Sequence, residues 1–132
     1  MIFIDASAFI AHDNKDDVHH AAAAKLWQEL ESGKHGQLFT SDYVFNEVVG
    51  VTFRKLGRGR AIVLGQQILK SVFVINIDEH ILAEAWKIFS KTELNFGLVD
   101  CTTLVVMELA SSKAIATFDK EFGKVVGLDI LD

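Results

Sequence analysis

Short runs of consecutive hydrophobic residues alternate along the chain with longer segments of helical character. The short runs have the length and apolar content of buried strands, and they lie at residues 1–4, 38–40, 73–77, 114–117 and 128–131. The longer segments are predicted to be helices, at residues 7–12, 17–31, 42–56, 60–71, 79–91, 99–110 and 120–124. Apolar strands that alternate with helices indicate a parallel sheet covered on both faces. The pattern therefore predicts an α/β fold.

Small polar residues and glycines mark the expected ends of these helices. Residues whose side chains favour a helix start stand before three of the segments: Asp16 or Asp17, Ser41 or Asp42, and Asp78. Gly33 is expected to end the second helix, and Gly57 and Gly59 are expected to separate the third helix from the fourth.

Composition favours one domain spanning residues 1–132. Half of the 132 residues are hydrophobic, including ten Phe and two Trp, so the chain can bury a substantial core. No apolar run is long enough to span a bilayer, and Asp5 interrupts any signal-peptide core, so we expect a soluble, cytoplasmic protein with no membrane partner. Cys101 is the only cysteine, which excludes an internal disulfide or a thiolate zinc site.

The net charge of −5 argues against nucleic acid binding, but the distribution of charge argues for it. Phosphate binding depends on Lys and Arg, and four of these cluster in one short segment: Arg54, Lys55, Arg58 and Arg60. Arg54 is the best candidate to hold a phosphate, and the other three would extend the track. The alternative is a solvated run of charges with no partner.

Two aspartates follow predicted strands. Asp5 comes directly after the first strand, and Asp119 lies two residues after the fourth. Functional groups of parallel α/β folds gather at the carboxyl ends of the strands, so both acids are candidates for a site there. Either one could instead serve only as a helix cap.

Two further acids lie on predicted helices. Glu47 falls at the margin of an apolar helix face, and Gly50, one turn away, would leave room there for a ligand. Asp100 shares a helix stripe with apolar residues, where a lone buried carboxylate is costly unless it is paired or bound to a cation. The alternatives are an ordinary solvated Glu47 and an Asp100 stabilised by the helix dipole.

Together the four acids suggest a metal site rather than four separate features. No histidine or thiolate accompanies them, and oxygen ligands of this kind suit Mg²⁺ or Mn²⁺ better than zinc. Such an ion can activate water and stabilise the charge that develops in phosphodiester cleavage.

Four segments of the chain resemble those of PIN domains, and among these the VapC toxins of toxin–antitoxin pairs. The segments span nearly the whole chain and carry the acids in the family order. They are Ile4–Phe9 (IDASAF), Thr40–Val48 (TSDYVFNEV), Leu98–Thr102 (LVDCT) and Ala116–Phe122 (ATFDKEF).

The resemblance implies a three-layer α/β/α fold with a five-stranded parallel sheet. It implies that a magnesium or manganese ion is held by Asp5, Glu47, Asp100 and Asp119. It also implies that Ser7 and Thr117 orient a bound water or a neighbouring acid, although Ser7 could simply cap a helix. One position departs from the pattern, because relatives often carry Ser or Thr where this chain has Gly97.

The resemblance further implies a metal-dependent endoribonuclease that hydrolyses RNA phosphodiester bonds as the toxin of a VapBC-type system. Its expected partners are the RNA substrate, a cognate antitoxin and a second copy of the chain in a homodimer. Two alternatives share the family: a PIN nuclease of housekeeping RNA processing and a non-catalytic PIN-like interaction module. A response-regulator receiver fits less well, because Asp78 follows the third strand but the fifth strand is terminal, with no place for the required lysine.

Overall fold

The computed structural model describes residues 1–132 and confirms the predicted parallel sheet. Five strands pair in the order β3-β2-β1-β4-β5, all parallel. The strands are β1 (Ile2–Ile4), β2 (Leu38–Ser41), β3 (Phe73–Ile75), β4 (Ala114–Ala116) and β5 (Asp129–Leu131). The central strand β1 is fully buried, which agrees with its uninterrupted apolar sequence.

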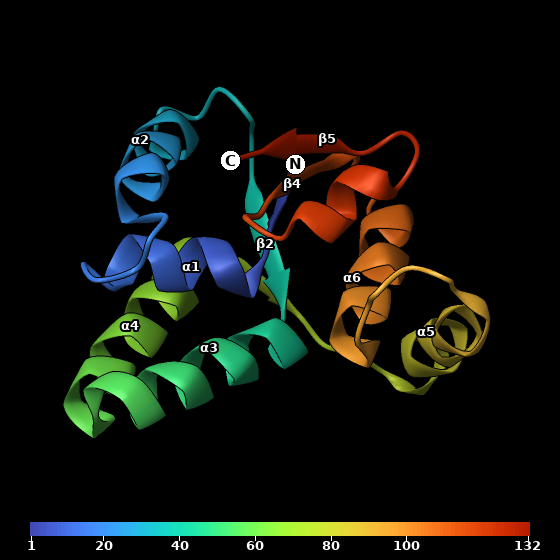
Figure 1. Ribbon diagram of the computed structural model, residues 1–132, viewed down its shortest axis with the longest axis horizontal. Coiled ribbons are helices and arrows are strands. Elements are labelled where there is room, and N and C mark those ends of the chain that lie inside the picture. Colours follow the sequence, from blue (N-terminus) through green and yellow to red (C-terminus); the bar gives the residue numbers. More distant parts are fainter.

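Helices connect the strands and cover both faces of the sheet. They are α1 (Ala6–Asp13), α2 (His20–Glu31), α3 (Asp42–Leu56), α4 (Arg58–Ser71), α5 (Glu79–Lys91), α6 (Leu98–Leu109) and the 3₁₀ helix η1 (Lys120–Lys124). Figure 1 shows α1 to α4 on one side of the strands and α5 and α6 on the other. Right-handed crossovers require this separation, because the chain moves outward from β1 to β3 and then returns across the sheet to β4.

The strand order creates a crevice between β1 and β4. The chain leaves β1 toward β2 on one side, and it leaves β4 toward β5 on the other. Ligand sites of open α/β sheets lie at such a reversal, just beyond the carboxyl ends of the strands. Asp5 and the segment Thr117–Asp119 follow these two strands, so the topology places them at this crevice.

The core fills both layers between sheet and helices. It comprises 24 buried hydrophobic residues, drawn from both faces of the sheet. Phe3 and Phe39 pack edge to face on adjacent strands, with ring centroids 5.3 Å apart. Cys101 is buried and unpaired, as a small core residue would be. This packing fixes the strand ends on which the acids are mounted.

Three predicted boundaries are wrong. The second helix begins at His20 rather than beside Asp16 or Asp17, because the Asp17 side chain accepts the backbone N–H of His19 and closes a separate turn. The strand β3 ends at Ile75, two residues earlier than expected, and Asp42 accepts the N–H of Ile77 just beyond it.

The third wrong boundary is the break between α3 and α4. Only Gly57 separates the two helices, with φ of 89°, and Gly59 lies within α4. The caps expected at Ser41 and Asp78 are confirmed, since these side chains accept the N–H groups of Val44 and Ile81.

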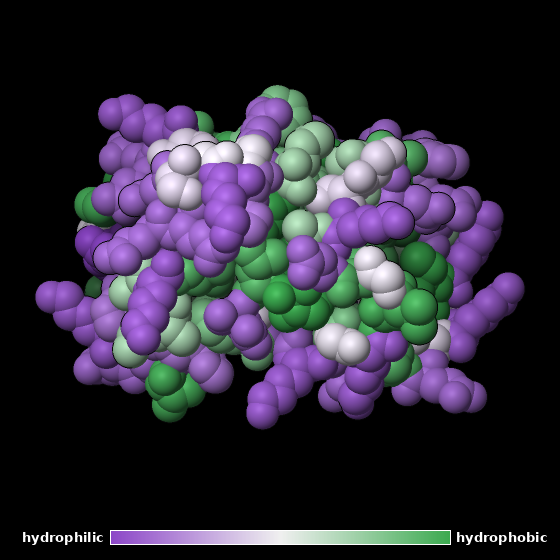
Figure 2. Space-filling model, turned by 90° about the horizontal axis from the view of Figure 1, so that it is seen from above, coloured by the Kyte–Doolittle hydropathy of each residue, from purple (hydrophilic) through white to green (hydrophobic).

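Several large hydrophobic side chains remain on the surface. They include Phe53, Ile62, Leu69, Phe73, Trp86 and Phe89, each at least 40% exposed. In the view of Figure 2, hydrophobic groups gather between hydrophilic margins instead of being evenly scattered. None of the helices is long and apolar enough to cross a membrane.

Candidate active site

Asp5 is the buried centre of the site. It stands at the junction of β1 and α1, where its backbone N–H donates to the carbonyl of Ala116 on β4 at 3.0 Å. Its carboxylate makes no capping bond to α1, so the simple cap function considered for it does not apply. Instead, Oδ2 accepts hydrogen bonds from Ser7 Oγ at 2.9 Å and from Thr117 Oγ1 at 2.8 Å.

Two hydroxyls therefore fix the Asp5 carboxylate. Each is held in turn by a backbone N–H: Ser7 Oγ accepts from Phe118 at 3.0 Å, and Thr117 Oγ1 accepts from Asp119 at 3.0 Å. Each hydroxyl donates its hydrogen to Asp5, so the oxygen of that hydroxyl is left to accept a hydrogen bond from a backbone N–H. No buried side-chain polar atom is left without a partner, so the network is complete. The predicted orienting role of Ser7 and Thr117 toward a neighbouring acid fits this geometry.

Glu47 and Asp100 approach from the two helix layers. Glu47 is the more exposed of the two and lies in the second turn of α3. Asp100 is half-buried in the first turn of α6, and its Oδ2 accepts the backbone N–H of Gly97 at 2.9 Å. A Cβ on Gly97 would meet this oxygen at 3.7 Å, an ordinary contact, so the Ser or Thr of relatives would fit here. The departure at Gly97 removes a hydroxyl but leaves Asp100 anchored.

Asp119 has two functions in the structure. Its Oδ1 accepts the N–H of Glu121 at 2.9 Å and so caps η1, which is the simpler of the two functions considered for it. Its charge also acts on the other acids, because it contributes to the raised pKa values of Asp5 and Asp100. Asp119 can therefore cap η1 and still lie close enough to Asp5 and Asp100 to affect their ionisation.

The four carboxyl groups act on one another electrostatically. Burial raises the pKa of Asp5, and the charge of Asp119 adds to this, against the opposing hydrogen bonds from Thr117 and Ser7. Loss of hydration raises the pKa of Glu47 even at its exposed position, and the charge of Asp5 adds to it. Burial raises the pKa of Asp100 to about 6, with further contributions from the other three acids. The cluster thus concentrates negative charge that nothing in the chain neutralises.

No basic side chain pairs with these four acids, since all five ion pairs of the chain lie elsewhere. As the side chains stand, no three His, Cys, Asp or Glu groups are arranged to enclose a metal ion. Two carboxylates, those of Asp100 and Asp119, turn one oxygen toward backbone N–H groups. The donor set still fits a hard divalent cation, because it consists of crowded, unpaired carboxylates. For all four carboxylates to meet one ion, some of these side chains would have to change rotamer.

The four basic residues of the α3–α4 segment have different environments. Arg60 is held by Asp13, whose side chain is almost fully covered, so it is engaged within the protein. Arg58 lies over the ring of Phe53, 4.8 Å from its centroid. Arg54 and Lys55 are exposed and form no ion pair. A Cβ on Gly50 would meet Arg54 Nη1 at 3.4 Å, so the glycine leaves room for Arg54 to fold back along α3.

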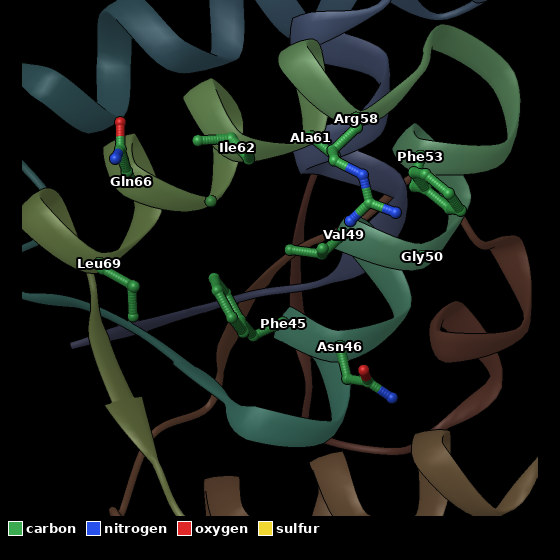
Figure 3. A pocket seen from close by; sticks show the side chains of 11 residues that line it. Phe45, Asn46, Val49, Gly50, Phe53, Arg58, Ala61, Ile62, Gln66 and Leu69 are labelled. Carbon is green, nitrogen blue, oxygen red and sulfur yellow. The ribbon is translucent and has the colours of Figure 1, made fainter.

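A groove between α3 and α4 continues this surface. It has a volume of about 420 Å³ and is lined mostly by apolar groups, among them Phe45, Val49 and Leu69. Figure 3 shows Arg58 and Phe53 together at one end and Asn46 at the rim. The groove therefore joins an apolar floor to a basic edge.

The fold is that of a PIN domain. The PIN domain family matches residues 2–128, and the chain belongs to this family. The family predicted from the four sequence segments is thereby confirmed.

Within the family, the similarity is to VapC proteins. The 23S rRNA-specific endonuclease VapC20 of Mycobacterium tuberculosis is 28% identical over 127 residues, which cover 92% of each chain. The crystal structure of VapC20, described as a sarcin–ricin loop cleaving toxin, matches with a TM-score of 0.86 at 24% identity and covers 97% of each chain. The DNA-bound VapBC of Salmonella typhimurium matches with a TM-score of 0.72 at 15% identity, over 98% of this chain and 95% of that one.

Two features of the site region escaped prediction from the sequence. One is the Asp13 partner of Arg60, 47 residues away. The other is a stack of the His19 and Phe118 rings, with centroids 4.7 Å apart and planes within 7°. Neither pair has a local signal, because only the tertiary fold brings such distant residues together.

The raised pKa of Asp100 predicts how stability depends on pH without metal. The folded protein keeps this proton up to a pH of about 6, whereas an ordinary Asp loses it at 3.8. The contribution of protonated Asp100 to the free energy of unfolding is therefore fully present below pH 3.8 and is lost as the pH rises through about 6. Between pH 3.8 and about 6, the free energy of unfolding should fall less in Asp100→Asn than in the native chain. Urea denaturation in EDTA measures this difference.

An exposed acid outside the site, Asp129, provides the matched control. Asp129→Asn should keep the pH dependence of the native chain. If Asp100→Asn and Asp129→Asn follow the same curve as the native protein, Asp100 does not have the raised pKa.

Proposed function

We propose that this PIN-domain protein is a Mg²⁺- or Mn²⁺-dependent endoribonuclease. The observation that carries the proposal is the Asp5 carboxylate, buried at the β1–β4 crevice and held by two hydroxyls beside three further acids. A chain gains nothing in stability from crowding unpaired carboxylates in one place. A divalent ion bound among them offsets that cost, so a cation-binding function explains the arrangement.

The residues Asp5, Glu47, Asp100 and Asp119 would hold the ion. When bound, it would supply an activated water and stabilise the oxygen that leaves phosphorus. Ser7 and Thr117 hold the Asp5 carboxylate in one orientation, which would fix the direction in which it meets the ion. Hydrolysis of the phosphodiester joins the water oxygen to phosphorus and breaks the bond to the 3′ oxygen, which leaves as a hydroxyl.

The substrate class follows from the relatives and from the charge distribution. VapC20 is named as a nuclease specific for 23S rRNA, and we propose a structured loop of ribosomal RNA as the substrate class here. Arg54 and Lys55 are free to contact phosphates beside Glu47 on α3. Arg58 would extend the track, whereas Arg60 would have to leave Asp13 to join it.

A toxin function and an antitoxin partner complete the proposal. Similar structures include the VapBC complex of Salmonella typhimurium and a toxin–antitoxin complex of Klebsiella pneumoniae. Exposed apolar groups and the α3–α4 groove provide surface for such a partner or for a second copy of the chain. An antitoxin that places a basic side chain among the acids would neutralise the site. The proposed location of the reaction is the cytoplasm.

Cleavage of a sarcin–ricin loop RNA in Mg²⁺ or Mn²⁺ tests this function. We expect Asp5→Asn to lower kcat/KM on the order of a hundredfold or more, because the buried ligand loses its charge. Thr117→Val keeps the shape but removes one hydrogen bond to Asp5, and we expect a loss of roughly tenfold to a hundredfold. Asp129→Asn, an exposed change at the amino end of β5, should cleave like the native protein.

Full cleavage by purified Asp5→Asn would contradict the assignment. So would equal cleavage by the native protein in EDTA and in Mg²⁺, since both outcomes remove the need for a carboxylate-bound ion.

The basic track has its own test in the salt dependence of RNA binding. Each phosphate contact to a single strand contributes a slope of about 0.7 in the logarithmic plot of affinity against salt. We expect Arg54→Ala to weaken binding and to reduce the slope by about this amount. Lys70→Ala, which removes an exposed cation of α4, should leave the slope unchanged. Equal slopes for the native protein and Arg54→Ala would exclude Arg54 from the phosphate contacts.

A further inference from the structure

Two aromatic rings stack beside the segment that carries Thr117 and Asp119. Phe118 lies between Thr117 and Asp119, and its ring is nearly parallel to that of His19, with centroids 4.7 Å apart. Its backbone N–H donates to Ser7 Oγ at 3.0 Å, one hydrogen bond from Asp5. The stack is therefore mounted on the same network that holds the central carboxylate.

The turn before α2 presets the position of His19. Its backbone N–H donates to Asp17 Oδ1 at 2.8 Å. The neighbouring His20 ring lies with Nδ1 2.8 Å from the carbonyl oxygen of Ala11, which ties the turn to α1. The His19 ring makes no hydrogen bond within the chain, and the residue is exposed. One face of the imidazole thus covers Phe118 while the residue remains open to solvent.

We propose that His19, backed by Phe118, is a stacking platform for an unpaired RNA base next to the scissile phosphate. This inference rests on the proposed ribonuclease function and identifies a positioning residue for it. Recognition of unpaired RNA typically uses bases splayed out and stacked on aromatic rings, including His and Phe. A flat ring, held from behind by a second ring and exposed beside a phosphodiester site, has the geometry for such a contact.

The chain spacing sets which base can reach the platform. Phe118 and Asp119 are consecutive, with Cα atoms about 3.8 Å apart, so the stack is carried by the same short segment as one acid of the proposed site. For a phosphate bound among the acids, an adjacent base would then be in reach. Val18, beside His19, is an apolar side chain that is 91% exposed, and it would cover the edge of the bound nucleotide. Lys120, exposed and unpaired after Asp119, can meet the next phosphate.

Steady-state cleavage of a sarcin–ricin loop RNA by His19→Ala and His19→Phe tests the platform. Stacking of one base strengthens binding about tenfold. We therefore expect His19→Ala to raise KM by about tenfold and to leave kcat within about twofold of the native value. His19→Phe keeps a flat ring and should restore KM. His80→Ala, an exposed histidine on α5, is the matched control and should behave like the native chain.

Thermal unfolding separates positioning from structure. Because His19 is exposed, His19→Ala and His80→Ala should melt at similar temperatures. An unchanged KM in His19→Ala overturns the platform. A raised KM that His19→Phe does not restore, together with a lower melting temperature, also overturns it and leaves only a structural function for the stack.

A fluorescence readout keeps this inference distinct from the proposed catalysis. The same RNA can carry 2-aminopurine at successive positions of the loop, and stacking quenches its emission. We expect the native protein to quench one position and His19→Ala not to do so. This pattern without any cleavage would support the platform while the nuclease function fails. Cleavage by the native protein with equal quenching by His19→Ala would overturn the platform and leave the nuclease function intact.

Discussion

The carboxylate of Asp5 is buried at the point where two neighbouring strands, β1 and β4, end. Taking this group out of water is unfavourable, and the crowding of Asp119 makes ionisation harder still. The hydroxyls of Ser7 and Thr117 offset part of the cost, and in doing so they tie the chain after β1 to the chain after β4. A cation would favour the ionised form that burial disfavours, which is the physical basis of the proposed metal site.

The fold delivers the other acids to this carboxylate without using long or flexible segments. The central strand β1 ends at Asp5, the strand β4 leads to Asp119, and the helices α3 and α6 bring Glu47 and Asp100 from opposite layers. Each acid stands on or next to a regular element, so the cluster is preorganised by the same packing that forms the core.

Most of the fold could be predicted from the sequence, because it is expressed in local signals, and the positions of the four acids after strands and on helices made them candidates for a site. Apolar runs predict the strands, and capping residues such as Ser41 and Asp78 predict helix starts. Orientation could not be predicted, because it depends on contacts between distant segments. The sequence does not show that the Asp100 carboxylate turns toward Gly97 or that Arg60 is held within the protein. It also cannot distinguish a turn closed by an Asp side chain from a helix capped by one.

Metal binding at Asp5 can be measured through the melting temperature of the native protein and of Asp5→Asn, each with and without Mg²⁺ or Mn²⁺. Binding to the folded state alone stabilises it, so the native protein should melt several degrees higher with the ion. Asp5→Asn lacks the buried charge, so it should melt higher than the native protein in EDTA and gain little from either metal. An equal gain in both proteins, or none in the native one, would contradict the claim that the Asp5 cluster is built to hold a divalent ion.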